Sequence, residues 1–235
     1  MKIIIAIPAF NEASVLSPTV DTVVNYCQRA IADEWRVVIA DNGSTDGTSV
    51  IAQALSKKYQ NVSAITVPTR GKGAAIRAAW NHVDADVYCF MDADLATDLS
   101  ALPTAIAAVR TGADVVCGSR FHRQSVVQRS LPRWVASAGY RAVARLLVGK
   151  TVSDLPCGFK AITSKIKETV LSDVANDGWF FDSELVIRSV WHAKRVAEIP
   201  VRWRDPREGT DKSRVRPLAL AREYLRNLLA LRRSR

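Results

Sequence analysis

The stretch Val87-Tyr88-Cys89-Phe90-Met91-Asp92-Ala93-Asp94 decides the fold. A short continuous apolar run is typical of a strand buried on both faces of a parallel sheet. Two carboxylates follow directly where that run ends. Because side chains two residues apart in an extended chain share a face, Asp92 and Asp94 are expected to point the same way. The sequence therefore predicts a buried central strand that carries an acidic pair at its carboxyl end.

Similar β-branched runs alternate with helical patterns on both sides of this stretch, which predicts an α/β fold with a mainly parallel central sheet flanked by helices. The expected strands are 2–7, 37–40, 62–67, 87–91, 113–118, 159–163 and 195–203, and the expected helices are 13–32, 48–58, 72–83, 99–111, 131–148 and 184–192. Asp46 and Gly71 are interpreted as helix start signals. The chain is expected to form one domain over residues 1–216, with halves of about 1–119 and 120–216, followed by a basic amphipathic helix over 217–235.

Composition and charge narrow the class of protein. The 235 residues are 48% hydrophobic and 24% charged, as in a soluble globular protein, and no apolar run approaches the ~20 residues of a membrane-spanning helix. Residues 1–119 hold 9 Lys and Arg against 12 Asp and Glu (−3), whereas residues 120–235 hold 24 against 11 (+13). A basic half fits nucleic acid, anionic lipid headgroups or a phosphorylated small molecule, and charge does not choose among them.

The cysteines and the N-terminus indicate a compartment. Four cysteines without a Cys-x-x-Cys pair favour reduced thiols in a cytoplasmic protein over a disulfide framework or a zinc site. The first apolar run is too short for a signal peptide and is expected to be a strand.

Polar residues follow the first four predicted strands, at 8–12, 41–48, 69–73 and 92–94. In an open parallel sheet, ligands bind beyond the carboxyl ends of the strands, so these segments are expected to converge on one crevice. Mg²⁺ or Mn²⁺ bridging a diphosphate is the economical explanation for Asp92 and Asp94, because hard cations combine carboxylate oxygens with substrate phosphates. The plain alternative is that these aspartates only cap a turn.

Two neighbouring segments allow both a structural and a functional interpretation. Asp46 is expected to cap the following helix, whereas Asp41, at its strand end, could accept from a nucleobase N–H or a ribose hydroxyl. Lys72 lies between two glycines where a helix opens, which suits a diphosphate at the helix N-terminus but also suits a solvated turn.

In this combination, the sequence resembles the polyprenyl-phosphate (dolichyl-phosphate) hexose synthases of glycosyltransferase family 2, which have the Rossmann-like GT-A fold. The resemblance runs from Ile3 to about Val215 and rests on Pro8-Ala9-Phe10-Asn11-Glu12, Asp41 to Thr48, Gly71-Lys72-Gly73-Ala74, Met91 to Leu95, Gly118-Ser119-Arg120, Cys157-Gly158-Phe159-Lys160 and Glu198-Ile199-Pro200-Val201. It implies a hexosyltransferase whose nucleotide-sugar half is about 1–119 and whose acceptor half is about 120–216.

The resemblance implies a role for each matching residue. The nucleotide-sugar would be bound by Pro8, Ala9, Phe10, Asn11, Glu12, Asp41, Asn42, Gly43, Lys72, Asp92, Ala93 and Asp94, and by a basic loop with Arg207, Lys212, Ser213 and Arg214. Asp92 and Asp94 would hold Mg²⁺ or Mn²⁺, with Asp94 nearest the ion, and Arg120, Arg133 and Ser137 would bind the acceptor phosphate. Asp94 and Arg120 are the expected catalytic residues. Asp182 and Glu184 could contact sugar hydroxyls or could bridge neighbouring elements.

The sequence departs from the family pattern at three places. Asn42 stands where a second acidic residue is common, and Ala96 stands where an amide is common, so water would fill that metal position. The basic loop is longer than the family's Arg-x-x-Gly-x-Ser, which leaves the roles of its single residues open.

The implied mechanism is one inverting displacement. A lipid phosphate is already anionic and needs no general base, so no histidine is expected to be essential, and His82, His122 and His192 are interpreted as surface or packing residues. Cys157 is likewise expected to pack, because no partnered base accompanies it. The donor is expected to be GDP-mannose, with UDP-glucose possible.

The helical patterns at 131–148 and 217–235 combine leucines, arginines and aromatics, which suits either an anionic membrane surface or packing on the domain. A peripheral enzyme on the inner face of the cytoplasmic membrane is the resulting expectation. The alternatives are a glycosyltransferase with a soluble or polymeric acceptor, and a nucleic-acid-binding module, for which no motif is found. Processive synthesis is disfavoured because Ser130 stands where the Gln-x-x-Arg-Trp motif would begin.

Overall fold

The computed structural model describes residues 1–128, 131–149, 151–204 and 217–234. Strands are β1 (Lys2–Ala9), β2 (Glu34–Asp41), β3 (Val62–Thr66), β4 (Val87–Met91), β5 (Val115–Ser119), β6 (Val126–Gln128), β7 (Phe159–Thr163), β8 (Val196–Pro200) and β9 (Arg202–Arg204). Helices are α1 (Ala13–Ala30), α2 (Thr48–Lys58), α3 (Lys72–His82), α4 (Ala101–Arg110), α5 (Leu131–Val148), α6 (Ser164–Thr169), α7 (Phe181–Trp191) and α8 (Pro217–Arg233), with a short 3-10 turn at Leu171–Asp173.

Seven strands form the central sheet in the order β3-β2-β1-β4-β7-β5-β8, and β6 and β9 form a separate pair. All the central strands run parallel except β7, which is antiparallel to both β4 and β5. The expected strands at 87–91 and 159–163 are confirmed, with the same first and last residues. Because β7 runs the opposite way, its first residue, Phe159, pairs with Met91, the last residue of β4. The segment that leads into β7 therefore lies at the carboxyl edge of the sheet, beside Asp92.

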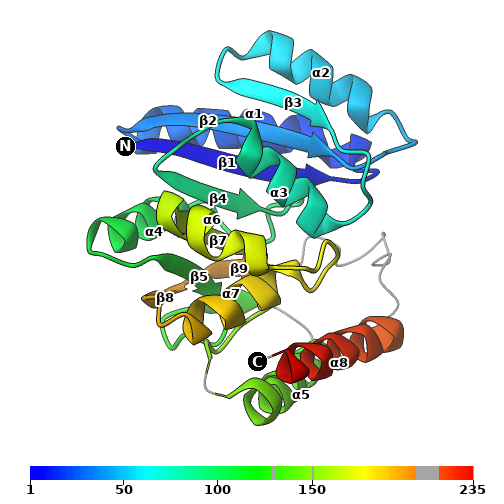
Figure 1. The fold of residues 1–235 in the computed structure, drawn as a ribbon. Helices are drawn as coiled ribbons and strands as arrows, with labels where there is room; N and C mark the ends of the chain where they lie inside the picture. Colours follow the sequence, from blue (N-terminus) through cyan, green and yellow to red (C-terminus); the bar gives the residue numbers. More distant parts are fainter. Residues whose placement is uncertain (129–130, 150, 205–216, 235) are drawn as a thin grey trace.

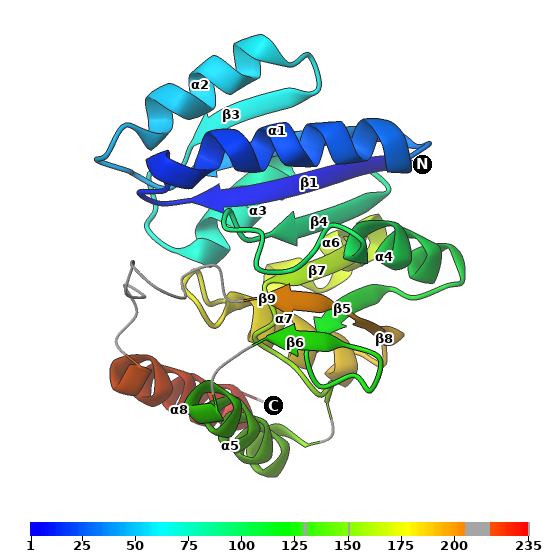
Figure 2. The same cartoon turned by 180° about the vertical axis from the view of Figure 1, so that it is seen from behind.

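Helices cover both faces of the sheet and enclose one apolar layer on each (Figures 1 and 2). On one face, α1, α2 and α4 pack against β-strand side chains such as Ile5 and Ile39. On the other face, α3, α6 and α7 enclose a cluster that includes Trp80 and Phe90, both fully buried. The sheet is thus buried on both sides, which explains why its strands read as continuous apolar runs.

Helices α5 and α8 lie side by side at one end of the molecule, away from the strands β1 to β3 (Figures 1 and 2). One face of α8 packs on the rest of the chain. It contributes Tyr224, Leu228 and Leu231 to the apolar cluster that includes Trp80 and Phe90. The sequence left open whether this helix packs or meets a membrane. One face of α8 packs here, whereas Leu225 and Leu229 on its other face are exposed.

The second half of the chain departs from the expected elements at two places. The predicted strand 195–203 is divided, because the chain leaves the central sheet at Val201, whose N–H donates to the Ser125 hydroxyl and whose carbonyl accepts from the N–H of Val126. β9 then pairs with β6, a three-residue strand that the hydropathy pattern did not predict. The short helix α6 was also missed.

Candidate active site

The loops after β1 and β2 form one side of the site at the carboxyl edge. Asn11 has a left-handed backbone (φ 55°), its N–H donates to the Ser44 hydroxyl, and its side-chain oxygen accepts from the N–H of Thr45 at 2.7 Å. Pro8 and Ala9 end β1, and Phe10 after them is 44% exposed. The two loops are therefore locked to each other, with Phe10 left at the surface as a platform that a base could stack on.

Two aspartates of the β2 loop have different surroundings. Asp46 serves two helix starts, because its carboxylate accepts from the N–H of Thr48 at the start of α2 and from the N–H of Ala13 at the start of α1. The predicted start signal is thus confirmed in effect, although Gly47 is the residue at the cap. Asp41 is buried, and one of its oxygens accepts from the N–H of Ser44 at 3.3 Å.

Asn42 uses its side chain to hold the protein's own backbone. Its amide nitrogen donates to the carbonyl of Thr69 at 2.6 Å, and its oxygen accepts from the N–H of Gly71 at 2.6 Å. An aspartate could not donate the first of these bonds. Asn42 therefore fixes the loop that leads into α3, and the nucleotide contact that the resemblance implies for Asn42 and Gly43 stays a prediction.

The N-terminus of α3 is closed by another part of the chain. The N–H groups of Gly73 and Ala74 donate to the carbonyls of Gly178 and Asp177 at 3.2 and 3.0 Å. A Cβ added at Gly73 would overlap the Phe181 side chain, so the glycine is needed for this close approach. These two N–H groups are already engaged within the chain, and diphosphate binding at this helix start through Lys72 stays a prediction.

Lys72, the first residue of α3, points instead to the acidic pair. Its ammonium lies 2.6 Å from an Asp92 oxygen and is close to the rings of Phe90 and Trp179, at 5.2 and 5.4 Å from their centroids. Burial alone would lower the pKa of Lys72, but the charges of Asp92 and Asp182 raise it above its ordinary value. The Lys72 side chain is only 11% exposed and that of Asp92 is 35% exposed, so the lysine stands behind the carboxylate.

Asp94 lies in the turn that follows β4 and begins at Asp92. One of its oxygens accepts from the N–H of Ala96 at 3.1 Å, and Leu95 between them has a left-handed backbone. Within the described residues, no third His, Cys, Asp or Glu completes a metal-ligating group here. Two carboxylates at a strand end fit a hard cation whose remaining ligands are diphosphate and water oxygens. Asp92 and Asp94 are the residues that would hold such a cation.

Arg120, just beyond β5, is held by a buried carboxylate. Its Nε and Nη2 lie 2.7 and 2.8 Å from the two oxygens of Asp154, and its backbone N–H donates to Asp154 as well. Its guanidinium lies over the ring of Trp203, 5.4 Å from the centroid. Burial alone would raise the pKa of Asp154, but the hydrogen bonds and charge of Arg120 hold it below its ordinary value. The pair uses two of the five guanidinium N–H groups, so it does not exhaust the arginine.

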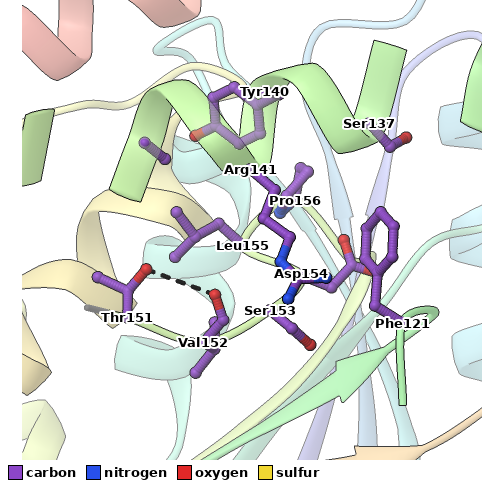
Figure 3. A pocket seen from close by; sticks show the side chains of 11 residues that line it. Phe121, Ser137, Tyr140, Arg141, Thr151, Val152, Ser153, Asp154, Leu155 and Pro156 are labelled. Atoms are coloured by element: carbon purple, nitrogen blue, oxygen red, sulfur yellow. Dashed lines mark hydrogen bonds between the residues drawn. The ribbon is translucent and has the colours of Figure 1, made fainter. Parts of the chain in front are cut away.

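An open hollow adjoins this pair, between α5 and the segment that precedes β7 (Figure 3). Ser137 of α5 lines it together with Phe121, Tyr140 and Asp154. The predicted acceptor residues Arg120 and Ser137 are thus brought to one region by elements distant in the sequence. Arg133 also belongs to α5. Arg207, Lys212, Ser213 and Arg214 lie outside the described residues.

Asp182 and Glu184, predicted as second-rank candidates, have different surroundings. Glu184 accepts from the N–H groups of Ala175 and Asn176 and pairs with Arg188 at 2.7 Å, so it bridges neighbouring elements. Asp182 is 3% exposed, and burial raises its pKa while the charges of Lys160 and Lys72 oppose that shift. Of the two, Asp182 alone shares the electrostatic surroundings of the acidic pair.

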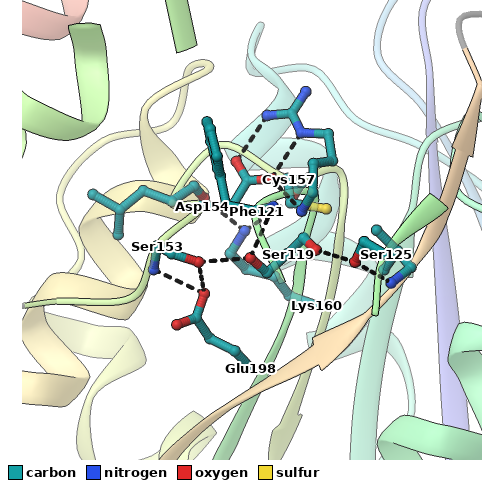
Figure 4. Close-up of polar contacts among 11 residues, drawn as sticks. Ser119, Phe121, Ser125, Ser153, Asp154, Cys157, Lys160 and Glu198 are labelled. Atoms are coloured by element: carbon teal, nitrogen blue, oxygen red, sulfur yellow. Dashed lines mark hydrogen bonds and ion pairs between the residues drawn. The ribbon is translucent and has the colours of Figure 1, made fainter. Parts of the chain in front are cut away.

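Several residues at this edge of the sheet were not predicted from the sequence. Asp154, Lys160 and Trp203 all lie in or near it, and Figure 4 shows the polar network around Ser153, Asp154, Lys160 and Glu198. Lys160 belongs to a motif of the family resemblance, but no role was assigned to it. Asp154 carried no local signal, because its partner lies 34 residues away in the chain.

The comparisons with known proteins define the class. Residues 4–171 match the model of glycosyl transferase family 2, so the chain belongs to that family. A crystal structure of glucosyl-3-phosphoglycerate synthase from Mycobacterium tuberculosis with uridine diphosphate superposes with a TM-score of 0.70 at 20% identity, covering 98% of this chain and 80% of that one. The predicted Rossmann-like GT-A architecture is confirmed.

Curated relatives extend the likeness beyond the family model. Glycosyltransferase AglD of Haloferax volcanii is 32% identical over 221 residues, covering 93% of this chain and 35% of AglD. Human dolichyl-phosphate beta-glucosyltransferase is 31% identical over 221 residues (85% and 66%), and dolichol-phosphate mannosyltransferase of Pyrococcus furiosus is 27% identical over 234 residues (98% and 64%). The chain therefore spans between about a third and two thirds of the length of these relatives.

Proposed function

We propose that this chain transfers a hexose from a nucleotide-sugar to a polyprenyl phosphate, with a divalent metal held by Asp92 and Asp94. The observation that carries the proposal is the presence of two opposed charged sites at one edge of the sheet. Asp92 and Asp94 offer carboxylates at the end of β4, and Arg120 offers a guanidinium at the end of β5. Relatives named for dolichyl-phosphate transfer support the acceptor class.

The chemistry needs positioning and charge stabilisation rather than proton transfer. The acceptor phosphate is anionic at neutral pH and can attack the anomeric carbon directly, in line with the leaving diphosphate and with inversion. Arg120, with Ser137 and Arg133 on α5, would orient the phosphate, and Lys72 would hold the Asp92 carboxylate in place. A bound Mg²⁺ or Mn²⁺ would supply the positive charge that stabilises the departing nucleoside diphosphate.

Binding measurements are needed to identify the donor. Relatives named as glucosyltransferases and as a mannosyltransferase both resemble this chain, so GDP-mannose and UDP-glucose are both to be tested. The experiment is calorimetric titration with GDP-mannose, UDP-glucose, GDP and UDP, each with Mn²⁺ and with EDTA, followed by transfer to farnesyl phosphate.

Metal-dependent binding of one donor, absent in Asp94→Ala, together with transfer, is the expected result. Asp84→Asn is the matched control, because Asp84 is fully exposed and precedes the opposite end of β4. Binding of a donor with transfer only to a soluble acceptor would replace the polyprenyl phosphate in this proposal, and no donor binding would refute it.

We further propose that α5 and α8 together meet an anionic membrane surface on the cytoplasmic side. Trp134 and Leu146 of α5 and Leu225 and Leu229 of α8 are 39–80% exposed. Exposed arginines accompany them on the same helices, namely Arg145, Arg222, Arg226, Arg232 and Arg233. Aromatic and basic residues on paired amphipathic helices suit a headgroup layer. Across the described residues, no helix is both long enough and apolar enough to span a bilayer.

Vesicle flotation tests the membrane proposal. Trp134→Ser/Leu146→Ser is expected to lower binding to phosphatidylglycerol vesicles several-fold, because it removes apolar area without changing charge. Val50→Ser is the matched control, since Val50 is 74% exposed on α2, in the other half of the chain. Equal flotation of all three proteins would contradict the proposal.

A further inference from the structure

Asp154 is a buried carboxylate that the proposed mechanism does not use. Its side chain is 1% exposed, and both of its oxygens face the guanidinium and backbone of Arg120. A buried bidentate pair fixes the orientation of the arginine far better than a solvated one would, because both partners lose rotamer freedom. The direction in which Arg120 presents its remaining N–H groups is therefore set by Asp154.

The segment that carries Asp154 is itself held at both ends (Figure 4). Before it, the N–H and hydroxyl of Ser153 both donate to Glu198 of β8. After it, the Lys160 ammonium, fully buried, donates to the carbonyls of Leu155 and Cys157 at 2.7 and 2.8 Å. Asp154 thus sits on a short segment whose position is fixed by two separate strands.

The same segment touches the acidic pair. A Cβ added at Gly158 would overlap the Asp92 carboxylate, so the backbone at Gly158 lies directly against that side chain. The segment from Asp154 to Gly158 therefore contacts Arg120 at one end and Asp92 at the other. It is a fixed spacer between the group expected to meet the acceptor and the group expected to meet the donor.

We propose that Asp154 is a positioning residue for acceptor use: by holding Arg120, it sets where the acceptor phosphate lies relative to the donor. This inference rests on the proposed transfer to a polyprenyl phosphate. Asp154 itself touches neither substrate. Its loss is expected to affect the acceptor step, whereas donor binding at Asp92 and Asp94 stays intact.

The test compares Asp154→Asn with a matched pair elsewhere. Asp33 also holds an arginine through both oxygens, Arg110 at 2.8 and 2.6 Å, and it lies before β2, at the opposite edge of the sheet. Asp33→Asn therefore removes the same kind of contact away from the site. Donor binding is measured by titration, and kcat and KM are measured with farnesyl phosphate.

The expected result is that Asp154→Asn raises the KM for farnesyl phosphate about tenfold or more, the scale of one lost charged hydrogen bond. The donor Kd is expected to stay within about twofold, and Asp33→Asn is expected to change neither quantity. Asp154→Glu keeps the charge but displaces the carboxylate by one methylene, so it should raise the same KM even if Asp154→Asn folds poorly.

Two outcomes would overturn the inference alone: an unchanged acceptor KM in both variants, or a donor Kd that rises as much as the acceptor KM. If wild-type protein binds a donor but neither binds nor uses farnesyl phosphate, the proposed acceptor is wrong and the positioning role is rejected with it. Wild-type activity therefore separates failure of the inference from failure of the proposed function.

Discussion

The two ion pairs at the carboxyl edge are arranged in opposite senses. In the Lys72–Asp92 pair, the cation is 11% exposed and the carboxylate 35%, whereas in the Arg120–Asp154 pair the cation is 13% exposed and the carboxylate 1%. The first pair presents a carboxylate backed by a lysine. The second presents a guanidinium backed by an aspartate.

This difference teaches how one edge can serve two ligands of different chemistry. A carboxylate that is held in place by a buried lysine suits a metal ion, and a guanidinium that is oriented by a buried aspartate suits a phosphate. The uneven charge of the chain, −3 over residues 1–119 and +13 over residues 120–235, follows the same division. Of the two less exposed partners, Lys72 was singled out from the sequence, whereas Asp154 was not.

The largest expected effect comes from removing the presented carboxylate. Asp92→Asn is expected to lower kcat for transfer about 100-fold or more, because an interaction that stabilises developing charge is lost. The KM for farnesyl phosphate should change little, which separates this variant from Asp154→Asn. Steady-state kinetics with both substrates varied checks this, with Asp84→Asn as the control, and a loss confined to acceptor KM would contradict the comparison.

A second prediction compares the unfolding free energy that is lost when the cation of each ion pair is removed. The cost depends on how deeply the remaining carboxylate is buried. Arg120→Met strands a buried Asp154 and is expected to cost about 3 kcal/mol, whereas Lys72→Met leaves a more exposed Asp92 and should cost about 1 kcal/mol. Urea unfolding measures both values. Adding Asp154→Leu to Arg120→Met is expected to recover part of the loss, because no unpaired charge then remains buried. Equal costs for the two single variants would contradict this account.

The elements predicted correctly from sequence are those whose signal is local. The run Val87–Met91 is buried on both faces, so its apolar character alone marks it as a strand. β7 was found as an element, but its antiparallel place between β4 and β5 was not, because pairing joins residues distant in the chain. β6 was missed because it has three residues with Val126 exposed, which leaves no pattern to detect.

The residues of the candidate site also differ in how much local signal the sequence carries for them. Strand-end position and family resemblance together identified Asp92, Asp94 and Arg120. The close approach at Gly73 was not predicted, because the sequence does not show that the Asp177–Gly178 backbone meets the first turn of α3. Asp154 could not be found at all, since a loop aspartate gains its role only when folding brings Arg120 against it.

A smaller effect is expected on stability at acid pH, where the buried Asp154 carboxylate becomes protonated. The folded-state pKa of Asp154 lies below its usual value of 3.8, so the folded protein binds fewer protons there than the unfolded chain. The pair's contribution to stability is therefore complete above pH 3.8 and is lost as the pH falls below it. The difference in unfolding free energy between wild type and Asp154→Asn should narrow as the pH falls below 3.8, as followed by urea unfolding.

Asp182 provides the control of opposite sign. Burial raises its folded-state pKa above 3.8, so its contribution falls as the pH rises through the window above that value. Wild type should therefore lose stability relative to Asp182→Asn as the pH rises from 4. The same direction of change for both aspartates would contradict the assignment of Asp154 to a charge-stabilised pair.

The smallest effect is expected from the histidines, since both sites are explained by fixed charges alone. His82 and His192 are exposed, and the ring nitrogen of His122 accepts from the N–H of Gln124. The triple variant His82→Gln/His122→Asn/His192→Gln keeps that acceptor, because an asparagine oxygen can replace the ring nitrogen. Transfer should stay within about tenfold of wild type, and the pH–rate profile of the triple variant should keep the shape of the wild-type profile, which includes the second ionisation of the acceptor phosphate at about pH 6. A loss beyond about 100-fold, with a changed pH–rate profile, would mean that the acceptor needs a general base. In that case the Arg120–Asp154 pair would not suffice to activate the acceptor phosphate. The carboxyl edge would then need a proton acceptor in addition to its two charged sites.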